Sequence, residues 1–325
     1  MLGAPQVVAT GFSWAENLAC VRNHTSGSAH LFVSENRRGE LWRIAWEGSG
    51  YTQTMMPLSS NFSRFAGLTA YEGRLFALGN RQEDDGKCEL IEVLPHGGFD
   101  VIAILPRKCL GDGLAVQQRA SGLAFYSANE GDFLVDNGRV YWTDSTTGSV
   151  ITIPPSGFSD DGAFIDPASG HLYVSEVASP EHKVQVYNTT TSGGIVPRLV
   201  DTIRPHGIES LDDFSIRDGT LYGGDTLSGC VVSFDLPTVG SGTRPQASRL
   251  ACGIKSPTSA RFGCSSDPAS GLYEELLFVS EGGGTTKATH DRRVLVIRPT
   301  DPTWPRTGAG AGAGAGAGPE GQPPY

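Results

Sequence analysis

The chain has few charged residues and no long apolar run. Only 18% of its 325 residues are charged, and no stretch of 18 or more apolar residues occurs. The sequence therefore contains no candidate membrane-spanning helix. The formal net charge of −10 disfavours a nucleic-acid partner, which would require a basic face. The first residues, MLGAPQVV, show neither the basic nor the apolar part of a signal peptide, and we expect such a peptide to have been removed.

Glycine and proline, in contrast, are abundant, with 43 and 20 residues. Both residues break helices and punctuate short strands. The composition therefore favours an all-β protein.

A strand–turn–strand pattern recurs along the chain, as in GRVYWTDSTTGSVITI at 138–153. The second position of its first strand is an aromatic residue, and these aromatic anchors are Phe32, Phe76, Tyr141, Tyr173, Tyr222 and Phe278. Each interval between anchors is long enough for a four-stranded antiparallel sheet, and sheets packed radially cover one another. The pattern predicts a single six-bladed β-propeller over 1–304. A Gly/Ala/Pro-rich tail over 305–325 has nothing to bury and is expected to be disordered.

The segment QVVATG at 6–11 has no blade of its own. We expect it to pair with RRVLVIRP at the other end of the domain, which closes the ring and removes an exposed edge.

The six cysteines show no zinc-like spacing. Two pairs, Cys88–Cys109 and Cys230–Cys252, lie at equal distances from a hairpin turn, which places each pair on facing strands. By elimination Cys20 pairs with Cys264. Three sequons, at Asn23, Asn61 and Asn188, are candidate glycosylation sites. Together these features predict a secreted protein or one of the secretory-pathway lumen.

An acid follows most anchors, and these acids are Glu35, Asp144, Glu176, Asp225 and Glu281. Because it recurs from blade to blade, we expect a structural role, such as accepting hydrogen bonds from the following turn.

The acids that precede the anchors differ between blades, as expected for a site at the mouth of the channel. Glu16, Asp161 and Asp212 would converge there from distant parts of the chain. Since like charges disfavour joint ionisation, a Ca²⁺ ion with hard oxygen ligands would stabilise such a cluster. The alternative is that these residues are separate, solvated turn caps.

Across most of residues 6–299, the approach-strand and anchor pattern resembles the SMP-30/gluconolactonase/strictosidine-synthase-like propellers. In the calcium-dependent lactonases of that family, a Glu, two Asn and an Asp hold the metal. The resemblance assigns the Glu to Glu16, the Asp to Asp212 and the second Asn to Asp161. The first Asn falls on Gly131, which lacks a side-chain oxygen, although Asp132 would replace it after a one-residue shift. The substrate-binding Arg of the family falls on Asn129.

Other site candidates rest on residue type and position. No GxSxG or HExxH motif is present. His206 precedes the Asp212 segment and is a candidate acid–base group, or else a surface residue. Trp14, Phe65 and Phe133 are candidate walls of the cavity, or else packing residues of the blades.

The organisation also resembles a fungal branch of secreted propellers that catalyse intermolecular hetero-Diels–Alder cyclisation in tropolone–sesquiterpenoid biosynthesis. Such an enzyme needs no cofactor, because it holds two apolar or aromatic substrates in reacting geometry and donates hydrogen bonds. Trp14 and Phe65 beside Asn17, Asn129 or His206 suit this role, and this cyclisation is the preferred prediction. The alternatives are a Ca²⁺-dependent lactonase and a noncatalytic ligand-binding propeller.

Overall fold

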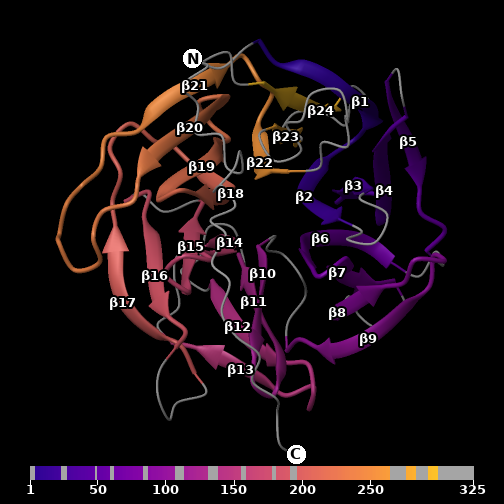
Figure 1. Cartoon of the computed structure of the whole chain (residues 1–325), viewed down its shortest axis with the longest axis horizontal. Coiled ribbons are helices and arrows are strands. Elements are labelled where there is room, and N and C mark those ends of the chain that lie inside the picture. The colour runs from indigo at the N-terminus through magenta and orange to yellow at the C-terminus, as the bar shows by residue number, and fades with distance from the viewer. Residues whose placement is uncertain are drawn as a thin grey trace, which may run out of the picture.

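The computed structural model describes residues 4–22, 28–47, 50–58, 62–82, 87–106, 113–130, 138–154, 159–177, 181–190, 196–263, 276–282 and 292–298. These residues form six four-stranded antiparallel sheets. The sheets stand as blades around one axis, with one edge strand of each blade at the centre (Figure 1). The prediction of a six-bladed β-propeller is confirmed.

The first three blades follow one another in chain order. Blade 1 comprises β2 (Ala15–Arg22), β3 (Ala29–Glu35), β4 (Glu40–Trp46) and β5 (Tyr51–Met55). Blade 2 comprises β6 (Phe62–Tyr71), β7 (Arg74–Arg81), β8 (Cys88–Val93) and β9 (Phe99–Ile104). Blade 3 comprises β10 (Leu114–Arg119), β11 (Gly122–Asn129), β12 (Arg139–Asp144) and β13 (Val150–Ile153).

The remaining blades complete the ring. Blade 4 comprises β14 (Asp160–Ile165), β15 (His171–Glu176), β16 (Val184–Asn188) and β17 (Arg198–Ile203). Blade 5 comprises β18 (Leu211–Arg217), β19 (Thr220–Asp225), β20 (Cys230–Asp235) and β21 (Ser248–Cys252). Blade 6 comprises β22 (Pro257–Phe262), β23 (Leu277–Glu281), β24 (Arg292–Ile297) and β1 (Gln6–Phe12).

The two ends of the domain meet in blade 6, as predicted. Strand β1 pairs antiparallel with β24, with Gln6 opposite Val296 and Thr10 opposite Arg293. The side chain of Gln53 on β5 then bonds both backbone groups of Thr10, at 3.1 and 3.0 Å. The N-terminal strand is therefore held by both blades that flank the closure.

The apolar core lies between blades. Each cluster of buried apolar side chains joins two neighbouring blades, including blades 6 and 1, where Phe12, Val33 and Phe278 pack together. Five of the six aromatic anchors are buried in such clusters: Phe32, Phe76, Tyr141, Tyr173 and Phe278. Because apolar burial contributes about 25 cal/mol per Å², the anchors stabilise the contact between sheets that could not stand alone.

Serine and threonine hydroxyls join the inner strands of neighbouring blades. Ser175 Oγ accepts the N–H of Gly162 at 2.9 Å and donates to the carbonyl of Asp212 at 2.8 Å. Ser280 Oγ and Thr258 Oγ1 both bond the carbonyl of Glu16, at 2.5 and 3.1 Å. The backbone that carries the candidate site is therefore held between blades 4 and 5 and between blades 6 and 1.

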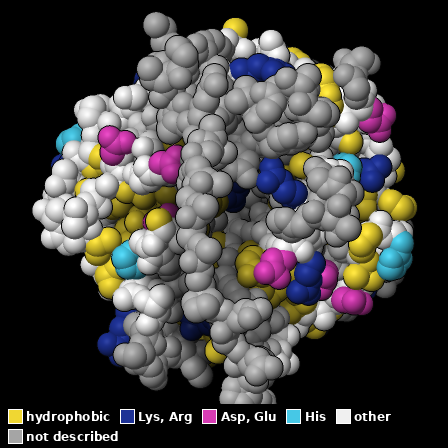
Figure 2. Space-filling view, viewed as in Figure 1, with side chains coloured by type: hydrophobic (Ala, Val, Ile, Leu, Met, Phe, Trp, Pro, Cys, Tyr) yellow, Lys and Arg dark blue, Asp and Glu magenta, His cyan; other side chains and the backbone are white. Residues whose placement is uncertain are grey.

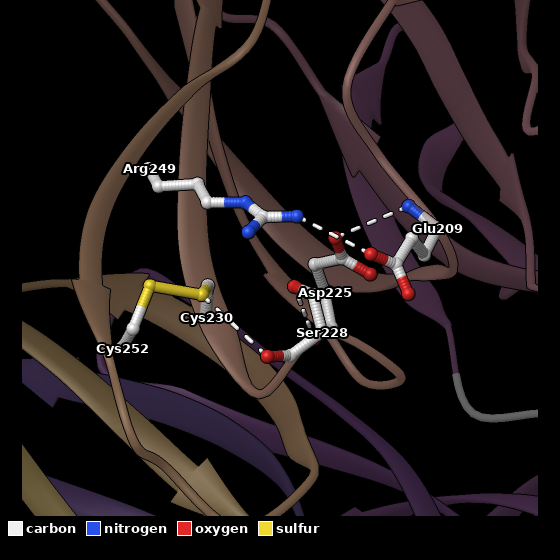
Figure 3. The surroundings of a disulfide bond; sticks show 6 residues. All are labelled: Glu209, Asp225, Ser228, Cys230, Arg249 and Cys252. Atoms are coloured by element: carbon white, nitrogen blue, oxygen red, sulfur yellow. Dashed lines mark hydrogen bonds and ion pairs between the residues drawn. A yellow bond between two sulfur atoms is a disulfide. The ribbon is translucent and has the colours of Figure 1, made fainter.

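One predicted disulfide is confirmed and the other two are tested in part. Cys230 and Cys252 face each other on β20 and β21, with Cα atoms 4.1 Å apart (Figure 3). Cys20 and Cys88 are also disulfide-bonded. Their predicted partners Cys264 and Cys109 lie outside the described residues, as does the predicted tail. No helix in the described segments has the length and apolarity needed to span a bilayer.

Candidate functional site

The inner strands begin with an irregularity that recurs around the ring. The ladder shifts register between Ala15 and Leu18, between Asp160 and Ala163, and between Leu211 and Phe214. Each shift places two residues of the inner strand in a bulge, a device that changes the direction of side chains. Glu16, Asp161 and Asp212 hold the first bulge position in blades 1, 4 and 5. The structure thus makes these three acids equivalent.

Glycine is required beside one of these acids. A Cβ atom at Gly162 would lie 2.6 Å from the Asp212 carbonyl oxygen and 2.8 Å from the Cα of Asp213. Such contacts are too short for any side chain. The inner strands of blades 4 and 5 can approach each other here only because residue 162 lacks a side chain.

The three acids are buried but do not form one compact set. Glu16 is 2% exposed and its Oε2 accepts from Asn36 Nδ2 at 3.3 Å. Asp212 Oδ1 accepts the N–H of Asp213 at 2.9 Å, and its Oδ2 lies 3.1 Å from Thr226 Oγ1. Among the residues the structure describes, no three His, Cys, Asp or Glu side chains are grouped to hold a metal. Calcium binding by Glu16, Asp161 and Asp212 together therefore remains a prediction.

Blade 1 carries several buried polar atoms on residues that neighbour Glu16 in the sequence or bond to it. Asn17 is fully buried, and neither atom of its side-chain amide has a hydrogen-bond partner in the described part of the chain. The same holds for Asn36 Oδ1 and Trp14 Nε1. A buried polar group without a partner costs about 1–3 kcal/mol. These atoms therefore indicate a place where a group from outside the described chain completes the hydrogen bonding.

The Glu16 cluster, defined as Trp14, Glu16, Asn17 and Asn36, is held firmly. Both oxygens of Glu35 lie 3.1 Å from the Trp14 backbone nitrogen. The Asn36 N–H donates to the Trp14 carbonyl at 3.0 Å. Our sequence interpretation missed Asn36, although its position directly after a recurring structural acid is a signal that would have found it.

A second polar group joins blades 4, 5 and 6. Asp213 is fully buried and accepts from Ser259 Oγ and from Arg261 Nη2, each at 2.8 Å. The Arg261 guanidinium also lies over the Phe164 ring, 5.2 Å from its centroid. Burial raises the pKa of the Asp213 carboxyl, and the bonds from Arg261 and Ser259 oppose that rise.

The other predicted site residues belong to several different parts of the fold. Asn129 is buried at the end of β11. Phe65 is fully buried against Phe62, with ring centroids 4.8 Å apart, so it packs within the core. His206 is exposed, and its backbone pairs with Gln246 beside the outer strand of blade 5. The structure does not bring it to the inner strands. Asp132 and Phe133 lie outside the described residues.

The recurring acids bind the backbone, as expected of structural residues. Asp144 Oδ1 accepts the N–H groups of Thr146 and Thr147 in the following turn. Asp225 and Glu35 also accept from the loop before their inner strand. Of the sequons, only Asn188 is described, and its Oδ1 accepts from the Thr190 hydroxyl at 2.9 Å. Asn23 and Asn61 lie outside the described residues.

The face drawn in Figure 2 is hollowed near its centre, where the inner strands meet, and Lys or Arg side chains are visible at the hollow. The candidate groups thus belong to strands that surround the axis of the molecule (Figure 1).

Three comparisons place this architecture among known proteins. Regucalcin, a calcium-binding protein from Agrobacterium tumefaciens, superposes with a TM-score of 0.59 at 16% identity over 91% of this chain and 93% of that one. The PQQ-bound aldose sugar dehydrogenase of Streptomyces coelicolor gives 0.58 at 14% identity over 92% and 98%. The periplasmic gluconolactonase of Pseudomonas aeruginosa gives 0.54 at 13% over 87% and 88%. No family model and no curated protein sequence matches the chain. At these identities the likeness establishes the six-bladed propeller fold of SMP-30/gluconolactonase-like and sugar-dehydrogenase proteins, and the fold alone.

Proposed function

We propose that this propeller hydrolyses lactones, with the Glu16 cluster as its catalytic centre. The observation that carries the proposal is the buried carboxylate of Glu16, which accepts from Asn36, in a segment whose amide and indole groups have no partner in the described chain. The gluconolactonase and the calcium-binding protein among the structural neighbours support this alternative better than a pericyclic reaction. No contact in the described residues favours the cyclisation that the sequence interpretation preferred.

The cluster has the donor chemistry of a calcium site. Glu16 offers a carboxylate, and Asn17 and Asn36 each offer an amide oxygen without a hydrogen-bond partner among the described residues. Ca²⁺ prefers such hard oxygen ligands and takes six to eight of them. A bound Ca²⁺ would polarise the lactone carbonyl. The protein would hold the ion through these three side chains of blade 1.

The remaining steps fall to groups of the chain itself. Trp14 Nε1 and Asn17 Nδ2 are buried donors, suited to bind the ester oxygen on which negative charge grows. Asp212 accepts the proton as a water oxygen bonds to the carbonyl carbon. The ring C–O bond then breaks, and the leaving alkoxide takes the proton back from Asp212 to give a hydroxy acid. The N–H of Asp213 and the Thr226 hydroxyl orient Asp212 for this role.

Hydrogen bonds connect Asp212 with Glu16 through blade 6. Thr226 Oγ1 lies 3.1 Å from Asp212 Oδ2 and 3.2 Å from the Pro257 carbonyl oxygen. The next residue, Thr258, bonds the carbonyls of Ala15 and Glu16. Asp212 and Glu16 are therefore linked through consecutive residues of blade 6.

The direct test compares Glu16→Gln with Glu209→Gln in the hydrolysis of a panel of aldonolactones. Glu209 is exposed and pairs with Arg249 in blade 5 (Figure 3), whereas the Glu16 cluster belongs to blade 1, so it provides a matched control. We expect E16Q to lower kcat/KM at least 100-fold, and E209Q to leave it unchanged. Chelation with EDTA should inactivate the wild type, and added Ca²⁺ should restore it. Ligand binding without turnover would instead establish a noncatalytic propeller.

The disulfides also indicate the kind of compartment in which the protein works. Cys230–Cys252 is formed and Cys20 and Cys88 are bonded, and such bonds persist in oxidising environments. We therefore infer that the enzyme works outside the reducing cytosol.

A further inference from the structure

The second polar group contains buried donors that the proposed hydrolysis does not use. Arg261 is 9% exposed, and its Nε has no hydrogen-bond partner among the described residues although its Nη2 bonds Asp213. Ser215 is 3% exposed, and its Oγ likewise has no partner there. Two neighbouring inner strands thus each carry one unsatisfied buried group.

These groups face the same space. Arg261 on β22 contacts Asp213 on β18 and the Phe164 ring on β14. Since β18 packs between β14 and β22, the Arg261 side chain must cross the face of β18 that looks toward the axis. Ser215 lies two residues after Asp213 on β18, and residues i and i+2 of a strand share a face. Ser215 therefore lies on the face that Arg261 crosses.

The group is separate from the Glu16 cluster. Ser215 follows Asp212 by three residues, which corresponds to about 10 Å along a strand. The Phe164 ring, the Ser215 hydroxyl and the Arg261 Nε–H come from blades 4, 5 and 6, whereas the Glu16 cluster belongs to blade 1. A molecule bound here would occupy the channel farther along the inner strands.

The charges favour a neutral ligand. Asp213 already neutralises Arg261, and its carboxylate also accepts from Ser259. A second anion would lie close to Asp213 and be repelled, while a cation would meet Arg261. The Nε–H can donate and the serine hydroxyl can donate or accept, and the Phe164 ring offers apolar contact beside them.

We propose that Phe164, Ser215 and Arg261 form a second binding site in the channel, for a small neutral molecule that carries hydroxyl or carbonyl oxygens on an apolar skeleton. The site is independent of the proposed hydrolysis, because binding alone is measured.

Propane-1,2-diol and lactate provide a matched pair of probes, since they share a carbon skeleton and differ by a CH₂OH or a carboxylate. In ligand-observed NMR titrations of the intact protein, we expect the diol to bind and lactate to bind at least tenfold more weakly. Ser215→Ala should weaken diol binding about fivefold, the usual effect of one lost hydrogen bond. Arg261→Lys keeps the charge opposite Asp213 but removes Nε, and should weaken it about tenfold.

Ser127→Ala is the control. Ser127 is as buried as Ser215 and its Oγ has no partner in the described chain, but it lies on β11, the second strand of blade 3. Binding of the diol should be unchanged in this variant. The proposal would be overturned if the wild type did not bind the diol, or if S215A and R261K bound it as tightly as the wild type does. Lactate binding more tightly than the diol would also overturn it. None of these outcomes bears on lactone hydrolysis.

Discussion

Asp213 of blade 5 and Arg261 of blade 6 form a buried ion pair, with Arg261 Nη2 2.8 Å from each carboxylate oxygen. Burial nevertheless raises the pKa of Asp213 above its ordinary value of 3.8. A raised carboxyl pKa means that the native state binds protons more tightly than the unfolded chain. The stability that this group contributes is thus fully present below pH 3.8 and is lost as pH rises through the folded-state pKa.

Arg261→Met should make this pH dependence steeper. The substitution removes the charge that lowers the pKa of Asp213, so the carboxylate remains buried without a counter-ion at neutral pH. Removing one partner of a buried pair costs about 3–5 kcal/mol, and we expect about 3 kcal/mol at pH 8. At pH 4, where a larger share of Asp213 is protonated than at pH 8, the loss should be smaller. Urea unfolding at the two pH values measures both, and equal losses would contradict the assignment.

Gly162→Ala should destabilise the contact between blades 4 and 5. Its Cβ would lie 2.6 Å from the Asp212 carbonyl oxygen, and such overpacking costs about 1–3 kcal/mol. Because the clash displaces Asp212, lactone hydrolysis should also fall. Gly50→Ala is the control, since a Cβ at Gly50 has no atom within 4 Å. Thermal unfolding and kcat/KM of the two variants separate the effects, and equal behaviour would refute the close approach.

Asn17→Leu should raise the unfolding free energy and lower the rate of hydrolysis. The variant replaces a fully buried amide without a partner in the described chain by an apolar side chain of similar size. We expect the ligand-free protein to gain about 1 kcal/mol in unfolding free energy, the lower cost of an unsatisfied polar group. Hydrolysis should fall at least tenfold. A less stable variant with full activity would show that Asn17 serves only the fold.

Replacing both cysteines of the 230–252 bridge by serine should lower the unfolding free energy. The bridge spans 22 residues, for which the loop-entropy account gives about 3 kcal/mol. Urea unfolding of the double variant under non-reducing conditions measures the loss while the bonds of Cys20 and Cys88 remain. An unchanged midpoint would mean that the bridge does not restrict the unfolded chain enough to change the stability of the protein.

The fold could be predicted because each blade repeats one local pattern. The anchors, the turn glycines and the acids after the anchors report on contacts within a blade or with the next one. The sequence also placed Glu16, Asp161 and Asp212 before the anchors of their blades, but the bulge that makes them equivalent is seen only in the structure. That equivalence did not determine where the side chains point, and Glu16 and Asp212 bond within their own blades.

The sequence could not predict which individual side chains meet across blades. Arg261 lies 48 residues from its partner Asp213, and nothing in either segment indicates the other. Phe65 is aromatic, as a residue of a cavity wall would be, but it is enclosed in the core between blades 1 and 2. His206 precedes the Asp212 segment in sequence, yet its backbone pairs with Gln246, just before the outer strand of blade 5.

Proton release in a pH-stat on addition of an aldonolactone tests the hydrolase assignment most directly, because ring opening yields a carboxylic acid that ionises. The wild type with Ca²⁺ should release protons well above the buffer rate, and folded E16Q should fall to that rate. If the wild type releases no more protons than buffer with any lactone tested, or E16Q matches the wild type, the Glu16 cluster is not a hydrolytic centre.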